Sequence, residues 1–236
     1  MSAGVPPDTR TTLHLVAAHV LGRRRFAVSG RFGLRATPRG FGTPAFGEGP
    51  EVVRVSGTTL VREVGATRTR LPIPGASLRR LASFVEADID AEFSAGADTP
   101  PVGDPDAGLE LDTAETTVIA EWYRLGWEVL DSFLDTLGPE AEPATVQLWP
   151  EHFDAATAVA VAGGDHLNLG FSPGDAHEPD RYLYVGPWGE ARRGDPAFWN
   201  APFGAVLRAG EVTSAPEPAQ RCREFLAAGL RNAAGA

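Results

Sequence analysis

The sequence predicts an α+β fold, in which mostly antiparallel sheets pack with about four helices. Three observations lead to this class. Apolar residues recur at helical spacing in residues 112–137, they alternate with a period of two in much of residues 25–73 and 146–185, and Gly and Pro separate the alternating runs. Two sets of short strands that are separated by helices are typical of α+β proteins.

Four segments carry the start signals, the periodicity and the stop signals of helices. Gly22 is expected to end the first helix, for which Asp8 or Thr9 is the N-cap. Asp112 is followed three residues later by Glu115, which resembles a capping box at the start of the longest helix. The predicted helices are residues 9–21, 77–89, 112–137 and 218–232.

Strands are predicted where apolar and polar residues alternate between turn-forming residues. One hairpin is expected around Ser56–Gly57 and another around Gly163–Gly164. Phe26 and Val28 indicate a strand directly after the first helix. The predicted strands are residues 25–34 (a pair or a bent strand), 53–55, 60–64, 68–73, 146–149, 155–162, 167–171, 182–185 and 205–207.

The 236 residues are expected to form a single α+β domain. The segment 95–111 is rich in Gly, Pro and Asp, which makes it the candidate for an internal linker or a disordered excursion. On that reading, residues 9–94 and 112–236 would be two sub-units that this segment joins.

Charge is distributed unevenly within a net charge of −10. Residues 1–80 hold 13 Arg and 4 acidic residues, whereas residues 81–180 hold one Arg and 22 acidic residues. The basic part can pack against acidic helices of the same molecule, or each part can simply solvate its own face. The alternative is a patch for nucleic acid or a phosphorylated ligand, made of Arg23, Arg24, Arg25, Arg31, Arg35 and Arg39. Few aromatic residues lie between these arginines and the chain is acidic, so we do not expect nucleic acid as a partner.

The localisation that the sequence favours is the cytoplasm. The longest apolar runs are far shorter than the roughly 20 residues of a membrane helix, so no membrane partner is expected. The first residues lack the basic and apolar regions of a secretory signal, and the single Cys222 cannot form an internal disulfide. Cys222 lies on the apolar face of the last predicted helix, where buried packing is its expected role.

The stretch from Trp149 to Trp188 concentrates the reactive side chains, since it holds three of the five histidines among several carboxylates. Imidazole and carboxylate groups together serve metal ligation and proton transfer. His152 and Asp154 share one face if the segment is extended; alternatively, Asp154 caps a turn and His152 points to solvent. His166 and Asn168 both face one side of their strand, which is either solvent or the floor of a pocket.

The loop 172–179 is rich in turn formers, so its use can be purely structural, or it can be a lid that carries Asp175 and His177. Ser172 is followed by Pro173, which lacks the N–H that a nucleophile elbow needs, so a serine nucleophile is not expected. The chain has no His-Glu-x-x-His pair and no Cys cluster. The sequence therefore assigns no cofactor and leaves the question of a metal open.

Several short motifs occur in the order in which they occur in a bacterial protein family of unknown function, which this chain resembles. They are Thr12-Leu13-His14-Leu15 before Gly22, the helix around Trp122, Trp149 with Phe153-Asp154, Gly170-Phe-Ser-Pro-Gly174 and Tyr182-Leu-Tyr184. His152 stands where many members have a small residue. The resemblance implies an architecture and a site, and it implies no reaction. It also singles out His14, which is either a buried helix histidine satisfied by a carboxylate or a member of the pocket that holds His152.

The expected pocket is framed by the turn 149–154, the strand 166–172 and the loop 172–188. One function class is a binding module for a small ligand or a protein partner, with Trp149, Tyr182, Tyr184 and Trp188 as aromatic walls. The other is a hydrolase-type enzyme, with or without a metal, that uses His152, Asp154 and either His166 or His177. The candidate catalytic residues are His152, Asp154 and His166; the candidate ligand-binding residues are His14, Trp149, Asn168, Ser172, Asp175, His177, Tyr184 and Trp188.

Overall fold

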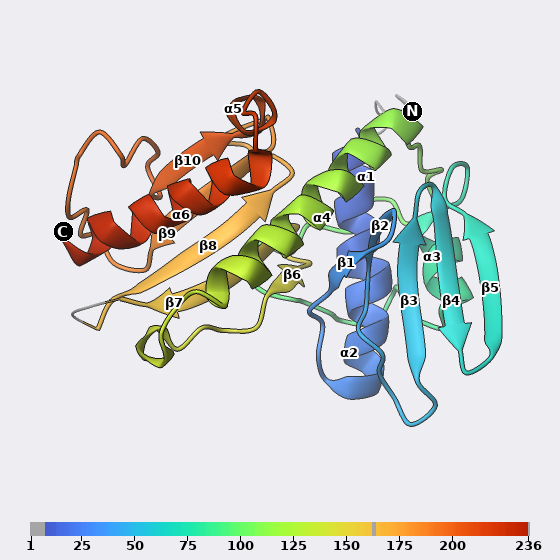
Figure 1. Ribbon diagram of the computed structural model, residues 1–236. Coiled ribbons are helices and arrows are strands. Elements are labelled where there is room, and N and C mark those ends of the chain that lie inside the picture. Colours follow the sequence, from blue (N-terminus) through green and yellow to red (C-terminus); the bar gives the residue numbers. More distant parts are fainter. Residues whose placement is uncertain (1–7, 162–163, 236) are drawn as a thin grey trace. The chain divides into compact units, whose positions relative to one another are not determined.

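The computed structural model, which describes residues 8–161 and 164–235, confirms the α+β class with two five-stranded antiparallel sheets and their helices (Figure 1). The chain divides into two compact units. The first consists of Met1–Arg124 and Leu148–Phe153, and the second consists of Leu125–Gln147 and Asp154–Ala236. The segment 95–111, which the sequence indicated as a linker, lies within the first unit.

The N-terminal helical run is longer than predicted. Helix α1 (Thr9–Val16) continues through the π-helical segment η1 (Ala17–Gly22) into α2 (Arg23–Ser29), and Gly30 ends the run at a φ of 67°. The predicted stop at Gly22 and the strand that starts with Phe26 and Val28 are therefore wrong. Gly22 keeps helical geometry, and its lack of a side chain lets Pro150 pack closely, since a β-carbon there would lie 3.3 Å from the Pro150 ring.

The first sheet is a meander of β1 (Arg35–Thr37), β2 (Gly40–Gly42), β3 (Glu51–Ser56), β4 (Thr59–Val64) and β5 (Thr67–Pro72), in that order. The predicted hairpin is confirmed, since Ser56 pairs with Thr59 across Gly57–Thr58. Val53, Val55 and Leu60 are fully buried on one face. Arg24 of α2 reaches the same face, where it pairs with Glu51 at 2.8 Å.

Helix α3 (Leu78–Phe84) begins as predicted, with Ser77 accepting a hydrogen bond from the Arg80 N–H. The segment that follows α3 is attached to the N-terminal helical run. His19 donates from Nε2 to the Pro100 carbonyl at 2.6 Å, and the Arg23 guanidinium bonds the Asp88 carbonyl at 3.0 Å and lies 5.0 Å from the centre of the Phe93 ring. The side chains of one helix thus order a segment that has no regular secondary structure of its own.

Helix α4 (Thr113–Leu134) begins at the predicted capping residue, because Asp112 Oδ1 accepts the Glu115 N–H at 2.7 Å. It ends at Leu134, before the predicted Gly138–Pro139 stop, and a short 3-10 turn, η2 (Pro139–Ala141), follows. The residues of α4 up to Arg124 belong to the first unit and those from Leu125 on belong to the second.

The second sheet has the order β10-β9-β8-β7-β6. Its strands are β6 (Gln147–Trp149), β7 (Asp154–Ala160), β8 (His166–Ser172), β9 (Tyr182–Pro187) and β10 (Ala205–Arg208). The predicted second hairpin is confirmed by the pairing of β7 with β8; Ala162 and Gly163 of its predicted turn lie outside the described residues.

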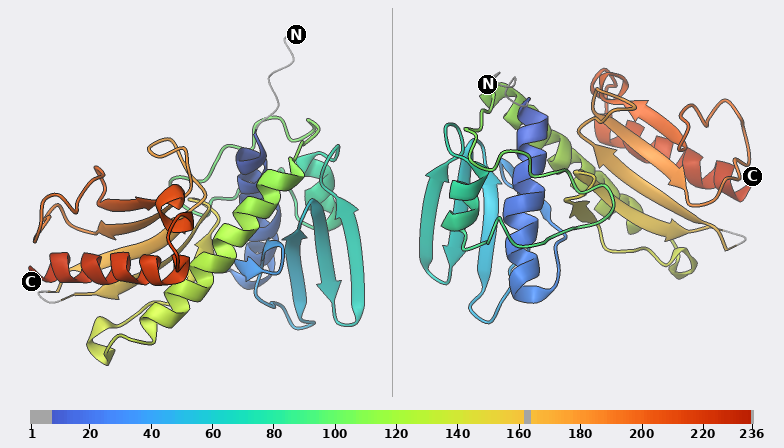
Figure 2. Two further views of the ribbon diagram at one scale, coloured as in Figure 1. Left: turned by 45° about the horizontal axis from the view of Figure 1, so that its top comes forward. Right: turned by 180° about the vertical axis from the view of Figure 1, so that it is seen from behind.

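Helix α6 (Pro218–Ala234) and the second part of α4 pack on one face of this sheet (Figure 2). Gly126 of α4 lies against Phe171, and Gly229 of α6 lies against Val185, so both helices approach closely. The last helix is confirmed, and Cys222 is buried on it as predicted. The short helix α5 (Ala209–Thr213) follows β10. Within the described part of the chain, no helix is both long and apolar enough to cross a membrane.

Candidate functional site

The turn 150–153 of the first unit has an unusual backbone that several contacts hold in place. Phe153 has a φ of 56°, which is rare for an aromatic residue. Its N–H donates to the Trp149 carbonyl at 2.7 Å, and the Tyr123 hydroxyl donates to the Phe153 carbonyl at 2.6 Å. The Phe153 ring is buried, with edge-to-face contacts to Phe41 at 5.3 Å and to Tyr123 at 5.5 Å. Packing and hydrogen bonds together stabilise a conformation that the residue alone would disfavour.

His14 binds this turn through the backbone. Its Nε2–H lies 3.0 Å from the carbonyl oxygens of both Pro150 and Glu151, and its ring stacks on Phe153 at 5.3 Å. Burial lowers the pKa of His14, although the two carbonyl groups oppose this effect. The predicted carboxylate partner of His14 is therefore wrong, and the alternative that His14 belongs to a pocket with His152 stays a prediction.

His152 lies between two carboxylates of the first unit. Its Nδ1 is 3.5 Å from Asp98 and its Nε2 is 3.5 Å from Glu151. The Glu151 carboxylate packs against Gly96, and burial, with a smaller contribution from Asp98, raises its pKa. A partly buried carboxyl group beside an imidazole is an arrangement suited to proton transfer.

Trp149, which was predicted as an aromatic wall, is half-buried in the first unit and lies 6.3 Å from the Phe32 ring. Asp154 belongs to the second unit, whereas His152 belongs to the first. The predicted pairing of His152 with Asp154 stays a prediction. The contacts that the structure shows for His152 are those with Asp98 and Glu151.

In the second unit, the face of the sheet opposite α4 and α6 carries small residues and tyrosines. The pairing register aligns Gly170 with Ala156 on one side and with Tyr184 on the other. The Tyr184 ring leans over Gly170, where a β-carbon would lie 2.6 Å from ring atoms, and its hydroxyl donates to Asp154 at 2.5 Å. Burial and the nearby Asp154 raise the pKa of Tyr184, so the hydroxyl stays protonated.

A second tyrosine–aspartate pair lies beside the first. The Tyr182 hydroxyl donates to Asp175, which also accepts the N–H groups of His177 at 2.7 Å and Glu178 at 2.9 Å. Burial opposes the ionised form of Asp175, but these hydrogen bonds outweigh burial and lower its pKa. Asp175 therefore organises the loop 172–179, which supports the structural reading of this loop.

Ser172 and His177, the other predicted residues of that loop, each contact a neighbouring group of the second unit. Ser172 is buried and its Oγ accepts the Gly174 N–H at 3.1 Å. The exposed His177 lies 5.9 Å from the Phe203 ring, which also contacts Tyr182 and Tyr184. Phe203 was not predicted as part of the site, because it follows a Pro in a segment with no periodic pattern.

Three predicted residues meet at the exposed end of β8 and β9, and we call Trp188, His166 and Asn168 the aromatic platform. Trp188 stacks on His166 with a centroid distance of 4.7 Å and an angle of 21° between the planes. Its indole Nε1–H donates to Asn168 Oδ1 at 2.7 Å. The indole is 64% exposed, so one aromatic surface faces solvent in a fixed orientation.

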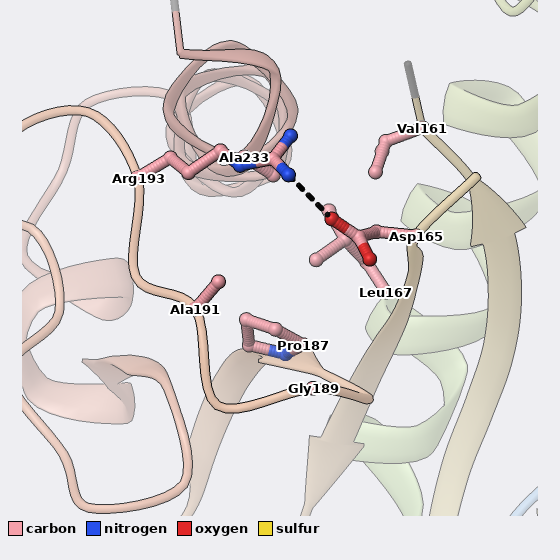
Figure 3. A pocket seen from close by; sticks show the side chains of 8 residues that line it. All are labelled: Val161, Asp165, Leu167, Pro187, Gly189, Ala191, Arg193 and Ala233. Atoms are coloured by element: carbon pink, nitrogen blue, oxygen red, sulfur yellow. Dashed lines mark ion pairs between the residues drawn. The ribbon is translucent and has the colours of Figure 1, made fainter. Parts of the chain in front are cut away.

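A small cavity of the second unit is lined by residues in and beside β8 and β9 and by Ala233 of α6, and by none of the three platform residues (Figure 3). Asp165 and Arg193 form an ion pair of 3.2 Å at its wall, and Leu167 and Pro187 are also among its lining residues. Its volume of about 20 Å³ admits roughly one water molecule. We therefore assign the cavity no ligand.

The described residues contain no group of three or more His, Cys, Asp and Glu side chains that could hold a metal ion. Besides Phe203, sequence reasoning missed Asp98, which contacts His152, and it missed Gly96 and Tyr123, which contact Glu151 and Phe153 of the same turn. Asp98 and Gly96 lie in the segment that the composition indicated as a linker, and Tyr123 lies in a helix whose periodicity predicts only core packing.

No protein-family model, curated protein or solved structure matches this chain.

Proposed function

We propose that the protein is a binding module for a small ligand and that the aromatic platform of the second unit receives this ligand. The proposal rests on one observation: Trp188 is 64% exposed and yet held in one orientation by His166 and Asn168. Single exposed apolar residues are common and need no explanation, but this indole has both a stacking partner and a hydrogen-bond partner. An aromatic surface that is ordered before binding loses less conformational entropy when a ligand covers it.

The surroundings of the platform favour a ligand with one flat apolar face and polar groups at its edge. The residues paired with His166 and Asn168 are Ala160, Ala158 and Gly186, so no large neighbouring side chain rises beside the indole from these positions. Asn168 uses Oδ1 for the indole, which leaves its amide N–H groups as donors for a ligand. Indole stacking together with a few directed hydrogen bonds is a common basis of small-ligand recognition.

Two further expectations belong to this proposal. The bacterial family resemblance and the cytoplasmic localisation remain inferences from the sequence. A small ligand is favoured over a protein partner, because the platform presents a single aromatic side chain and protein interfaces of ordinary size bury about 800 Å² on each partner.

The test is a ligand screen that reads the Trp188 indole N–H by NMR, with calorimetry for affinity. Neutral saccharides, nucleosides and aromatic amino acids form the panel. We expect one class to shift the Trp188 signal and to lose at least tenfold in affinity in Trp188→Ala. Trp199→Phe is the matched control, since Trp199 lies in the same unit and its indole bonds the Arg193 carbonyl. Binding that survives in Trp188→Ala would place the ligand elsewhere.

The second candidate is a hydrolase-type enzyme at the turn 150–153. Phe153 of this turn has a positive φ. The turn also contains Glu151 and His152, which contact each other, and burial raises the pKa of Glu151. Strained residues that their surroundings hold in place cluster at active sites. In this candidate Asp98, and not the predicted Asp154, lies beside the imidazole and orients it, and Glu151 exchanges a proton with His152. No metal step is included.

This candidate is tested with a panel of ester, amide and phosphoester substrates. If the turn is catalytic, Glu151→Gln and His152→Gln each lower kcat by about 10²-fold or more with a smaller change in KM. Glu92→Gln is the control, because Glu92 is an exposed carboxylate of the same unit. Equal rates in all four proteins would show that any measured hydrolysis does not depend on this turn.

A further inference from the structure

Strand β5 forms one edge of the first sheet, and among the residues that the structure describes no strand pairs with its outer side. It stands last in the order of that sheet, and its residues 67–70 are all exposed. The Ile73 N–H donates to the Thr58 carbonyl, in register with the pairing of β4 and β5. Because hydrogen-bonded pairs alternate along an antiparallel ladder, the N–H and C=O groups of Arg68 and Arg70 point away from β4.

The side chains of the same two residues stand on the sheet face opposite the helices. The pairing register places Arg35, Arg54 and Arg70 in one row across the five strands, with Gly42 and Val61 between them. Glu63 is the acidic residue on this face, and it pairs with Arg54 at 3.2 Å and with Arg68 at 2.9 Å. Within the described part of the chain, no ion pair is found for Arg70 or Arg35. This face therefore carries a net positive charge on a protein whose net charge is −10.

The arginine patch that the sequence suggested is a different set, and the structure divides it. Arg23 bonds backbone carbonyl groups, Arg24 pairs with Glu51, and Arg25 bonds the Gly33 carbonyl. Arg35 alone of that set belongs to the row described above.

We propose that β5 docks an extended acidic polypeptide segment of a partner, which joins the sheet as a sixth strand. Its backbone would pair with the outward N–H and C=O groups of Arg68 and Arg70. Acidic residues at every second position would lie opposite these two arginines on one face, where cross-strand pairs of opposite charge are favourable.

Two features favour this partner over the alternatives. A nucleic acid backbone has no alternating donors and acceptors that could pair along a strand edge, and Phe41, the single aromatic residue of β1–β5, is buried and so offers no stacking surface. A second copy of β5 would place arginines opposite arginines, which is destabilising. Arginines and the terminal Pro72 also protect an edge strand from aggregation. If protection were their whole role, an acidic strand would not bind to β5.

The experiment uses the full chain and a fluorescent seven-residue peptide that alternates Thr and Glu. At low salt we expect saturable binding, with NMR shifts concentrated at the Arg68 and Arg70 amides. The double variant Arg68→Glu, Arg70→Glu should lower the affinity at least tenfold. Arg80→Glu, an exposed arginine on α3, should change it less than about twofold.

Two further probes separate strand addition from simple charge attraction. A peptide with N-methyl groups on alternate residues keeps its charge, but one edge of its backbone has lost its N–H donors. It cannot pair with β5 through that edge, and we expect its binding to be lost. Equal binding of the N-methylated peptide would overturn the proposal, as would absence of peptide binding. Preference for a single-stranded oligonucleotide of equal charge would also overturn it and would assign the arginine row to nucleic acid.

Discussion

The two sheets share one topology and differ in the chemistry of the face opposite their helices. Each is a five-stranded antiparallel sheet whose strands follow one another in sequence order. In the first sheet, that face carries Arg35, Arg54 and Arg70; in the second, it carries Gly170 and Tyr184 between Ala156 and Val206. Because side chains alternate between faces, one face can hold the core while the other varies without changing the fold. The fold class thus determines where a site can lie. The strand residues that point away from the core determine the chemistry of that site.

The units also differ in how they satisfy buried tyrosine hydroxyl groups. In the first unit the Tyr123 hydroxyl donates to the Phe153 carbonyl, and in the second the Tyr184 hydroxyl donates to the Asp154 carboxylate. The first arrangement fixes a backbone turn, whereas the second involves an ionisable acceptor. Each difference leads to a change that can be measured.

The largest effect is expected from the buried ring that holds the turn of the first unit. Phe153→Ala removes a ring that contacts Phe41, Tyr123 and His14, and should lower the free energy of unfolding by about 3–5 kcal/mol. Phe153→Gly removes the same ring but tolerates the φ of 56°, so it should be the more stable of the two by roughly 1 kcal/mol. Urea unfolding of both variants measures the difference. If Gly is no more stable than Ala, the turn is not strained.

A smaller effect distinguishes the two tyrosines. Hydrogen bonds to charged acceptors contribute more than those to neutral ones, so Tyr184→Phe should cost about 1.5–3 kcal/mol and Tyr123→Phe about 0.5–1.5 kcal/mol. The chemical change is the same in both variants, which makes each the control of the other. Urea unfolding at neutral pH measures both costs. A larger loss in Tyr123→Phe would show that the carbonyl-bound hydroxyl is the more important of the two.

The third effect is a pH dependence in the first unit. Burial raises the pKa of Glu151 in the folded state, so folding favours its protonated form. Glu151 therefore causes stability to fall as the pH rises from its unfolded pKa through its higher folded pKa. Glu151→Gln should remove this fall and be slightly more stable than the native protein at neutral pH. Unfolding curves from pH 4 to 8 test this, and an unchanged pH profile in the variant would show that the Glu151 pKa is ordinary.

The sequence predicted most of the second unit because its signals are local. Alternation fixes which residues of β8 and β9 share a face, and it correctly placed His166 and Asn168 on one side of their strand. Their contact with Trp188 needs the register between two strands, which alternation alone does not give. The Asp112 and Ser77 caps of the first unit were likewise readable, since the side-chain oxygen of each cap accepts the N–H of the residue three positions later.

The errors in the first unit have a common cause, which is that a distant segment decides the local structure. Gly22 reads as a helix stop, but the helix continues through it and Pro150 packs closely where Gly22 has no side chain. His14 was expected to bind a carboxylate, but its partners are backbone carbonyl groups some 136 residues away. The segment 95–111 has the composition of a linker, yet His19 binds Pro100 within it. No pattern of residue types records such contacts.

The smallest effect on stability should accompany the largest effect on binding. Trp188 is 64% exposed, so Trp188→Ala should change the free energy of unfolding by less than about 0.5 kcal/mol. Trp149 is half-buried against Phe32 in the first unit, and Trp149→Ala should cost clearly more. Urea unfolding and the ligand screen on both variants therefore distinguish a Trp that binds a ligand from a Trp that packs in the core. If Trp188→Ala proved as destabilising as Trp149→Ala, the indole would be a packing element of the second sheet, and its fixed orientation would need no ligand to explain it.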